Sequence, residues 1–425
     1  MKFSFIHTAD IHLGRPFSDL PNLDDKTELC NRAVMRAFDK IVDVALAKNV
    51  DFVLIAGDSF DNDEHDLSTK RKFINNLMKL ADNNIKSYVI CGNHDPIELY
   101  KKYQSYFRFD KKYDEFIHIT GVTTDDYKCS FSPAEGVNIH TVSFKSDESP
   151  NQAADLPLLN SDMEKCFNIG LLHCDLDKTD SKYAPVSRED LKRTGYDYYA
   201  LGHIHIPELK ENNIVYAGSP QARTRKETGE HGCYYVQVCD KNIENIEFVP
   251  ADYVRFTDME VDCSDALNKL EIYNKISESL ENNCSNVELN LFNVTLKGIT
   301  KAFEELNETE SLVTEYIENY GQANRRFEVY KINNETMPDV DEKLLAEDNG
   351  IIGLVAKCFD ENSEIDVENI YKNISELHEN IYKKLGLDTE SKEFLSSSLT
   401  VDKEEILNNV RKEIQLLCKE IYTLE

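Results

Sequence analysis

Acidic, asparagine and histidine residues in this 425-residue chain recur directly after short apolar runs. In chain order the groups are Asp10-x-His12, Gly57-Asp58-x-x-Asp61, Gly92-Asn93-His94-Asp95, His173 and Gly202-His203-x-His205. Carboxylate, amide and imidazole donors suit Mn²⁺, Fe²⁺ or Zn²⁺ better than they suit a thiolate site. Two such ions about 3.5–4 Å apart could share one carboxylate, activate a water and clamp a phosphoryl group for in-line displacement. The residue types therefore predict metal-assisted phosphoryl chemistry.

The apolar runs before these groups predict buried β-strands that would position them. The predicted strands are Phe3–His7, Phe52–Ala56, Tyr88–Cys91, Val137–Phe144, Cys166–Leu172, Tyr198–Leu201, Ile214–Ala217 and Cys233–Val238. Helical stretches at Thr27–Lys48 and Ser68–Asn83, the second capped by Ser68, alternate with the early strands. This alternation predicts an α/β layered domain. Because ligands bind at the carboxyl ends of strands in such sheets, five strand ends can converge on one pocket.

The pattern of the chain changes near residue 252. Ser264–Asn282 predicts an amphipathic helix capped by Ser264, and a small α+β module would be completed by strands Val287–Lys297 and Arg326–Ile332 and a helix at Thr300–Leu306. Acidic helices are predicted after it at Asp339–Asn362, Asp366–Leu385 and Thr400–Leu424. We therefore predict three domains, at 1–252, 253–337 and 338–425.

Composition narrows the class of protein. The net charge of −30 argues against a protein that grips nucleic acid through a broad basic surface. Eleven cysteines without a CxxC pair argue against a disulfide framework and a thiolate zinc site. No apolar run reaches the roughly 20 residues that span a bilayer, and the N-terminus lacks the features of a signal peptide. We expect a cytoplasmic protein that does not contact membranes.

The ordered set DxH, GDxxD, GNHD, a later His and GHxH resembles the calcineurin-like metallophosphoesterases. The chain is similar, more narrowly, to the SbcD-like DNA-repair exonucleases, especially the shorter YhaO-type bacterial members. The stretches that carry this resemblance lie within residues 1–235 and are His7–Gly14, Ala56–Asp61, Cys91–Asp95, Leu201–His205 and Ala217–Gln221. The resemblance implies a four-layer α/β sandwich of two mixed β-sheets flanked by helices, followed by an α+β cap domain and a C-terminal helical region.

The resemblance also implies how the site residues divide between two divalent ions, with Mn²⁺ expected and Fe²⁺ or Zn²⁺ as alternatives. One ion would be held by Asp10, His12, Asp58 and His205, and the other by Asp58, Asn93, His173 and His203. His94 would face the scissile phosphate and stabilise charge or protonate the leaving oxygen. Asp95 would orient an imidazole. Asp61 replaces a histidine found in some family nucleases, so we expect it to support the site rather than to react.

Two further features are the spacing of the last two histidines and a basic cluster that follows them. Residues two apart on an extended segment point the same way, so His203 and His205 could reach adjacent ions. The stretch Arg223-Thr224-Arg225-Lys226 is one of the few basic clusters in the chain. Phosphate contact through Arg223 and Arg225 and a merely solvated turn are equally compatible with this cluster.

The leading hypothesis is a Mn²⁺-dependent phosphodiesterase that acts on DNA, the exonuclease subunit of an SbcCD-like repair complex. The resemblance implies that the cap selects DNA geometry and that the C-terminal helices dock on an SbcC-like coiled-coil ATPase. The grip on DNA would then come from that partner or from a homodimer. The alternative is a phosphomonoesterase or small-molecule phosphodiesterase of the same superfamily, and a non-enzymatic scaffold is disfavoured because every expected ligand is present. The metal, the polarity of digestion and any endonuclease activity stay open.

Overall fold

The computed structural model describes residues 1–15, 17, 27–61, 67–102, 107, 109–211, 213–306, 312, 316 and 326–339. The chain divides into two compact units. The first comprises Met1–Asp258, Cys284–Phe292 and Asn324–Tyr330, and the second comprises Met259–Asn283, Asn293–Ala323 and Lys331–Glu425. The helices predicted after residue 338 lie outside the described residues.

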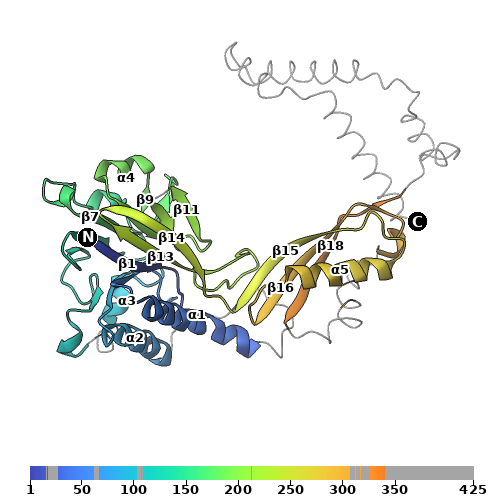
Figure 1. Ribbon diagram of the computed structural model, residues 1–425, viewed down its shortest axis with the longest axis horizontal. Coiled ribbons are helices and arrows are strands. Elements are labelled where there is room, and N and C mark those ends of the chain that lie inside the picture. Colours follow the sequence, from blue (N-terminus) through green and yellow to red (C-terminus); the bar gives the residue numbers. More distant parts are fainter. Residues whose placement is uncertain are drawn as a thin grey trace, which may run out of the picture. The chain divides into compact units, whose positions relative to one another are not determined.

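Two six-stranded mixed sheets form the first unit (Figure 1). The first sheet has the order β14 (Asn242–Pro250), β13 (Gly232–Cys239), β1 (Lys2–Thr8), β2 (Phe52–Ala56), β3 (Lys86–Ile90) and β4 (Ile117–Ile119). The second has the order β11 (Glu208–Glu211), β12 (Ile214–Tyr216), β10 (Tyr198–Gly202), β7 (Phe167–His173), β6 (Val137–Val142) and β5 (Lys128–Phe131). The strands from β1 to β4 and from β12 to β6 run parallel within their sheets. Their carboxyl ends therefore gather at one edge of each sheet.

The central strands of both sheets are buried on both faces, which explains their nearly continuous apolar runs. Phe5 and Phe52 of the first sheet pack with Ile169 and Tyr198 of the second in a core between the sheets. The helices α1 (Thr27–Lys48) and α2 (Leu67–Ala81) cover the outer face of the first sheet, and α4 (Arg188–Thr194) packs on the second. This arrangement confirms the predicted α/β sandwich of two mixed sheets flanked by helices.

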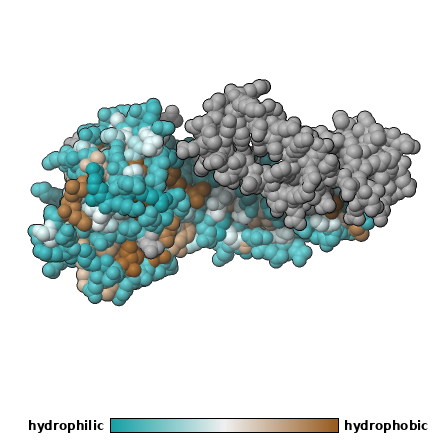
Figure 2. Space-filling view, turned by 90° about the horizontal axis from the view of Figure 1, so that it is seen from above, coloured by the Kyte–Doolittle hydropathy of each residue, from teal (hydrophilic) through white to brown (hydrophobic). Residues whose placement is uncertain are grey.

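The remaining short elements connect these layers. They are α3 (Ile97–Lys102), η1 (Lys111–Tyr113), η2 (Gln152–Asp155), η3 (Met163–Lys165), β8 (Asp175–Leu176) and β9 (Pro185–Val186). Hydrophilic residues cover most of the described surface that is visible in Figure 2, and apolar residues show in smaller areas. Among the described helices, none combines the length and the apolar character needed to cross a bilayer.

A three-stranded sheet follows, in the order β15 (Val254–Asp262), β16 (Leu289–Lys297) and β18 (Phe327–Asn334). The first residues of β15 and β16 pack in the first unit, where Val254 and Leu289 share a buried cluster with α1. The second unit holds α5 (Lys269–Asn283), η4 (Glu304–Leu306) and the pair β17 (Ile299–Thr300) and β19 (Met337–Pro338). The predicted helix at Thr300–Leu306 is therefore wrong, because only one 3-10 turn forms there.

Both predicted helix caps are wrong as well. The helix α2 already includes Leu67, so Ser68 lies inside it. The helix α5 begins at Lys269 because the side chain of Asn268 accepts the backbone N–H of Glu271 at 3.0 Å. The Ser264 hydroxyl instead donates to Asp262 at 2.6 Å.

Candidate metal centre

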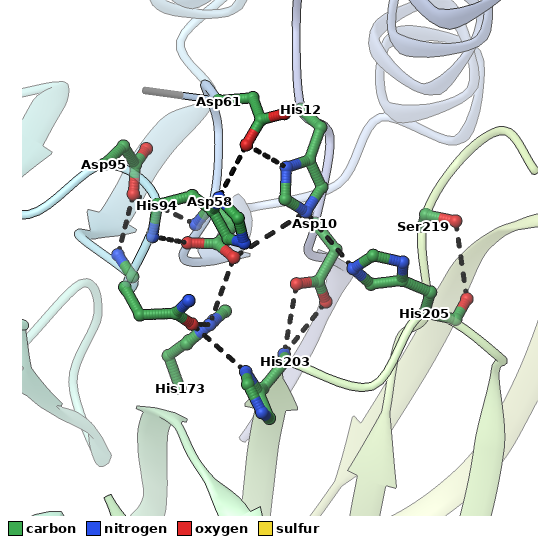
Figure 3. A network of polar contacts seen from close by, with 12 residues as sticks. Asp10, His12, Asp58, Asp61, His94, Asp95, His173, His203, His205 and Ser219 are labelled. Carbon is green, nitrogen blue, oxygen red and sulfur yellow. Dashed lines mark hydrogen bonds and ion pairs between the residues drawn. The ribbon is translucent and has the colours of Figure 1, made fainter. Parts of the chain in front are cut away.

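The polar groups that follow the strands meet at one place in the first unit (Figure 3). They come from the carboxyl ends of β1, β2 and β3 in one sheet and of β7 and β10 in the other. Ligand atoms lie within 4.8 Å of one another in three groups, which are Asp10 with His12 and His205, Asp10 with Asp58 and His173, and His12 with Asp61 and His94. The predicted convergence of five strand ends is thus present in the structure.

His173 has one ring nitrogen tied to the backbone and the other turned toward the centre. Its Nδ1–H donates to the carbonyl oxygen of Ala56 at 2.8 Å. Its Nε2 lies 2.9 Å from Asn93 Oδ1 and 3.4 Å from Asp58 Oδ2. Burial lowers the pKa of His173, but the charges of Asp58 and Asp10 and the hydrogen bonds to Asp58 and Ala56 together outweigh this and raise it to about 9. Only a proton or a metal cation can lie among these three electron-rich atoms, so the group fits a divalent ion.

A second meeting point lies between His12 and His205. Their Nε2 atoms are 3.2 Å apart, and His12 Nε2 is 3.6 Å from Asp58 Oδ2. Burial lowers the pKa of His12 to about 3, so this imidazole is neutral near pH 7. Asp10 is fully buried and belongs to the same group. Two imidazoles and a carboxylate facing one point are the donor set of a divalent transition metal.

Asp58 lies between the two meeting points, as a bridging ligand requires. Its Oδ2 atom is the one that faces both His12 and His173, and its Oδ1 accepts the backbone N–H of His94 at 2.9 Å. A Cβ at Gly92 would lie 2.1 Å from Asp58 Oδ1, so this approach requires glycine. Asp58 also has a positive φ of 49°, an uncommon backbone conformation that clusters at functional sites.

The prediction that His203 and His205 share an extended segment is wrong. His203 has a φ of 101°, which turns the chain between the two residues. Its backbone N–H contacts both carboxylate oxygens of Asp10, at 3.1 and 3.0 Å. Its Nδ1 lies 3.1 Å from Asn93 Oδ1, while His205 lies against His12. The two histidines therefore belong to different meeting points, although they do not leave the backbone in the same direction.

Asp95 has a different neighbourhood from the one we predict. Its buried carboxylate accepts five hydrogen bonds, and their donors are the backbone N–H groups of Asp58, Ser59, Phe60 and Gly92 and the hydroxyl of Tyr100. Burial and the charge of Asp58 raise the pKa of Asp95 to about 7, against these donors. None of the donors is an imidazole, so Asp95 holds the turns after β2 and β3 and does not orient His94.

Asp61 makes the imidazole contact that we predict for Asp95. Its Oδ1 lies 2.6 Å from His94 Nδ1, and its Oδ2 lies 2.9 Å from Arg15 Nε. The hydrogen bond to Asp61 raises the pKa of His94. The His94 side chain is 32% exposed, whereas those of His12 and His173 are fully buried. His94 thus borders the centre on a side that solvent reaches.

Three further residues surround the centre. Asp175 contacts His203 and Glu227 contacts His205, and neither acid is part of the motifs. Arg223 is 2% exposed and its Nη2 lies 3.3 Å from His205 Nδ1, while Arg225 is exposed. The predicted basic cluster is therefore divided between the edge of the centre and the surface. Sequence reasoning does not identify Glu227 as a site residue. The only signal for it in the sequence is its position four residues after Arg223.

Residues 3–207 match the model of the calcineurin-like phosphoesterase family. The chain is 30% identical over 291 residues to the metallophosphoesterase YhaO of Bacillus subtilis, covering 65% of this chain and 67% of that protein. It is 28% identical over 295 residues to the DNA double-strand break repair protein Mre11 of Methanocaldococcus jannaschii, covering 63% and 73% of the two chains. It is 23% identical over 275 residues to Mre11 of Methanopyrus kandleri and covers 57% of that protein's length and 59% of its own. The chain belongs to the calcineurin-like phosphoesterase family.

Proposed function

We propose that this protein is a two-metal phosphodiesterase that hydrolyses DNA. The observation that carries the proposal is the pair of meeting points on either side of Asp58, each lined by donor atoms that face one another. One ion would be held by Asp10, His12, Asp58 and His205, and the other by Asp58, Asn93, His173 and His203. Bound there, such ions would activate a water and neutralise the phosphoryl oxygens.

His94 is the residue of this chain that we assign to the leaving group. It is partly exposed and lies beside the centre, with its Nδ1 held by Asp61. This contact leaves Nε2 as the nitrogen that can give a proton to the leaving oxygen, and the raised pKa of His94 favours the protonated acid. Asp61 holds the imidazole in place and is itself paired with Arg15.

Arg223 is the residue that we assign to a phosphate oxygen. Its Nε and Nη1 atoms are buried and have no hydrogen-bond partner among the described residues. Leaving buried donors unpaired costs about 1–3 kcal/mol each, so an acceptor is expected there. A phosphate oxygen beside the His205 meeting point would supply it. Arg225 is exposed and would reach only a longer substrate.

The choice of DNA is supported by the similarity to Mre11 and by the chain that follows the family match. The β15–β16–β18 sheet and α5 lie beyond residue 207, where a minimal phosphoesterase does not need them. We propose Mn²⁺ as the metal, exonuclease activity in a cytoplasmic SbcCD-like repair complex, and an SbcC-like coiled-coil ATPase as the partner, docked on 338–425. The grip on DNA would come from this partner or from a homodimer.

The proposal is tested with the purified full chain, Mn²⁺ and three substrates: end-labelled DNA, bis(p-nitrophenyl) phosphate and p-nitrophenyl phosphate. We expect the two phosphodiesters to be cleaved, with less activity in Mg²⁺. Rapid hydrolysis of the monoester without any DNA cleavage would instead support the phosphomonoesterase alternative.

Asp58→Asn should abolish most of the activity and most of the metal binding, because the shared negative charge is lost. Asp162→Asn makes the same change at an exposed site before β7, at the strand end far from the centre, and should change neither property. Metal content by mass spectrometry and turnover measure both effects. An Asp58→Asn variant with two tightly bound ions and full turnover would show that Asp58 is not the bridge.

A further inference from the structure

Each histidine of the GHxH motif has a buried carboxylate at the ring nitrogen that faces away from its meeting point. Glu227 Oε1 lies 2.8 Å from His205 Nδ1, and Asp175 Oδ2 lies 3.3 Å from His203 Nε2. The two acids are only 7% and 4% exposed. A buried carboxylate is costly unless it is paired, so these contacts are not incidental surface pairs.

These carboxylates decide which nitrogen of each ring carries the proton. An ionised carboxylate only accepts hydrogen bonds, so the nitrogen that faces it must carry the hydrogen. His205 is therefore protonated on Nδ1, even though Arg223 Nη2 is 3.3 Å away, because a bare Nδ1 would place two lone pairs 2.8 Å apart. Its Nε2 is left bare and faces His12.

His203 has the opposite arrangement. Its Nε2 lies toward Asp175 and its Nδ1 faces Asn93 Oδ1 at 3.1 Å, so with an ion between Nδ1 and the amide oxygen the hydrogen of this ring would lie on Nε2. The φ of 101° at His203 turns the chain between the two histidines. Two histidines of one short motif thus present different nitrogens.

Both carboxylates are themselves held in place. Glu227 Oε2 accepts the backbone N–H of Arg223 at 2.7 Å. Asp175 accepts Lys178 Nζ at 2.8 Å and the Ser181 hydroxyl at 2.5 Å. Each carboxylate therefore contacts its histidine and is also hydrogen-bonded to its own loop. A carboxylate fixed in this way can orient the histidine that binds the metal.

We propose that Glu227 and Asp175 are positioning residues, and that each supports a different ion of the pair. Glu227 acts through His205 on the ion beside His12, and Asp175 acts through His203 on the ion beside Asn93. The inference rests on the two-ion site of the proposed function. Loss of such a partner of a ligand typically weakens metal binding 10–100-fold.

The test measures Mn²⁺ binding to metal-free full-length protein by calorimetry, with electron paramagnetic resonance to detect coupled ions. We expect two ions for the wild type. Glu227→Gln and Asp175→Asn should each weaken one ion 10–100-fold and leave the other unchanged. The matched controls are Glu230→Gln and Asp177→Asn, which remove exposed acids from the same loops and should leave both affinities unchanged.

Double variants identify which ion each acid supports. Glu227→Gln should cause no further loss of metal affinity in a His205→Ala background, because both changes act on the ion beside His12. In a His203→Ala background, which weakens the ion beside Asn93, Glu227→Gln should weaken the ion beside His12 as well. Asp175→Asn should show the reverse pattern. If Asp175→Asn does not fold, Ser181→Ala replaces it, since it loosens Asp175 without removing the charge, and a smaller loss at the same ion is expected.

The inference is overturned if either acid variant binds both ions as its control does, or if one variant weakens both ions equally. It is also overturned if the losses of Mn²⁺ affinity are additive for Glu227→Gln with His205→Ala, or for Asp175→Asn with His203→Ala. A wild type that binds fewer than two ions would refute the proposed two-ion site itself, which is a different result from unchanged variants of a two-ion protein.

Discussion

At the scale of single residues, the division between ligands and His94 makes a kinetic prediction. His94→Ala should keep both ions and lose roughly 10²–10⁴-fold in rate, the usual size of acid–base assistance. Asp61→Asn should lose less, because Asp61 acts by holding the His94 imidazole, and the double variant should be close to His94→Ala alone. A further loss in the double variant would come from the second contact of Asp61, with His12 Nδ1 at 3.8 Å. Turnover and metal content are measured together. Loss of metal from His94→Ala would place the residue among the ligands.

A second prediction at this scale concerns the proton that competes with the metal at His173. Burial lowers the pKa of His173, but Asp58, Asp10 and the Ala56 carbonyl together outweigh it and raise the pKa to about 9, so the metal-free protein holds a proton there at pH 7. Binding requires the neutral imidazole, so Mn²⁺ should release about one proton and bind roughly tenfold more tightly per pH unit below that pKa. Calorimetry at pH 6.5–8.5 in two buffers of different ionisation enthalpy measures this. Equal heats in both buffers would contradict it.

The sequence predicts the ligands at this scale but not their supports. Ligands such as Asp10, Asp58 and His173 end or follow apolar runs, so the edge of the sheet positions them. The acids that hold the histidines come from loops, where no periodicity shows the direction of a side chain. Asp95 illustrates the limit: its place beside His94 in the chain gives no indication that it binds the backbone of another loop.

At the scale of elements, the close approach of β10 to β2 makes a structural prediction. A Cβ at Gly202 would lie 1.9 Å from the carbonyl oxygen of Ala56 and 2.9 Å from His173 Nδ1. Gly202→Ala should therefore displace the carbonyl that holds His173 and impair metal binding as well as stability.

The matched control is Gly229→Ala, where the new Cβ meets nothing within 4 Å but the φ of 91° is unfavourable. It should lower stability by about 1 kcal/mol and leave metal binding unchanged. Thermal unfolding and Mn²⁺ affinity separate the two effects. Equal Mn²⁺ affinities in the two variants would show that the approach of β10 to β2 does not shape the centre.

Elements with both faces buried are predictable from sequence, and the others are less so. The strand predicted at Phe52–Ala56 and the helix at Thr27–Lys48 have the observed bounds, because apolar runs and amphipathic periodicity define them. The edge strand β14 alternates exposed and half-buried residues and is not predicted. Predictions of where a helix begins are wrong where the expected capping side chain binds another residue, as the Ser264 hydroxyl binds Asp262.

At the scale of the whole molecule, the charge of −30 would limit how the DNA substrate of the proposed function could bind. Among the described residues, Arg15 and Arg223 lie beside the centre, and Lys178 is paired with Asp175 behind His203. Each phosphate contact lowers log K by about 0.7–0.9 per unit of log salt, so the slope for the protein alone should be only about −2. Affinity for a short duplex, measured from 50 to 200 mM salt with Ca²⁺ to prevent cleavage, tests this. A slope of −6 or steeper would require an extended basic surface.

The division of the chain into units is the least predictable level. The strand β15 starts in the core of the first unit and ends in the second, so no change of composition marks the border at residue 258. The predicted border at 252 reflects a change in the pattern of predicted strands and helices, and the three-domain prediction stays a prediction. The helices expected over 338–425, with the docking role assigned to them, lie outside the described residues.

The anchoring of two loops by Asp95 has a consequence for the order of events during maturation of the protein. Four backbone amides on its carboxylate join the turns after β2 and β3 without any help from an ion. These amide protons should therefore exchange slowly with deuterated solvent even in protein that has never met metal. The metal site would then be preorganised when the newly made chain finishes folding, and the ions would bind to it without reshaping these turns.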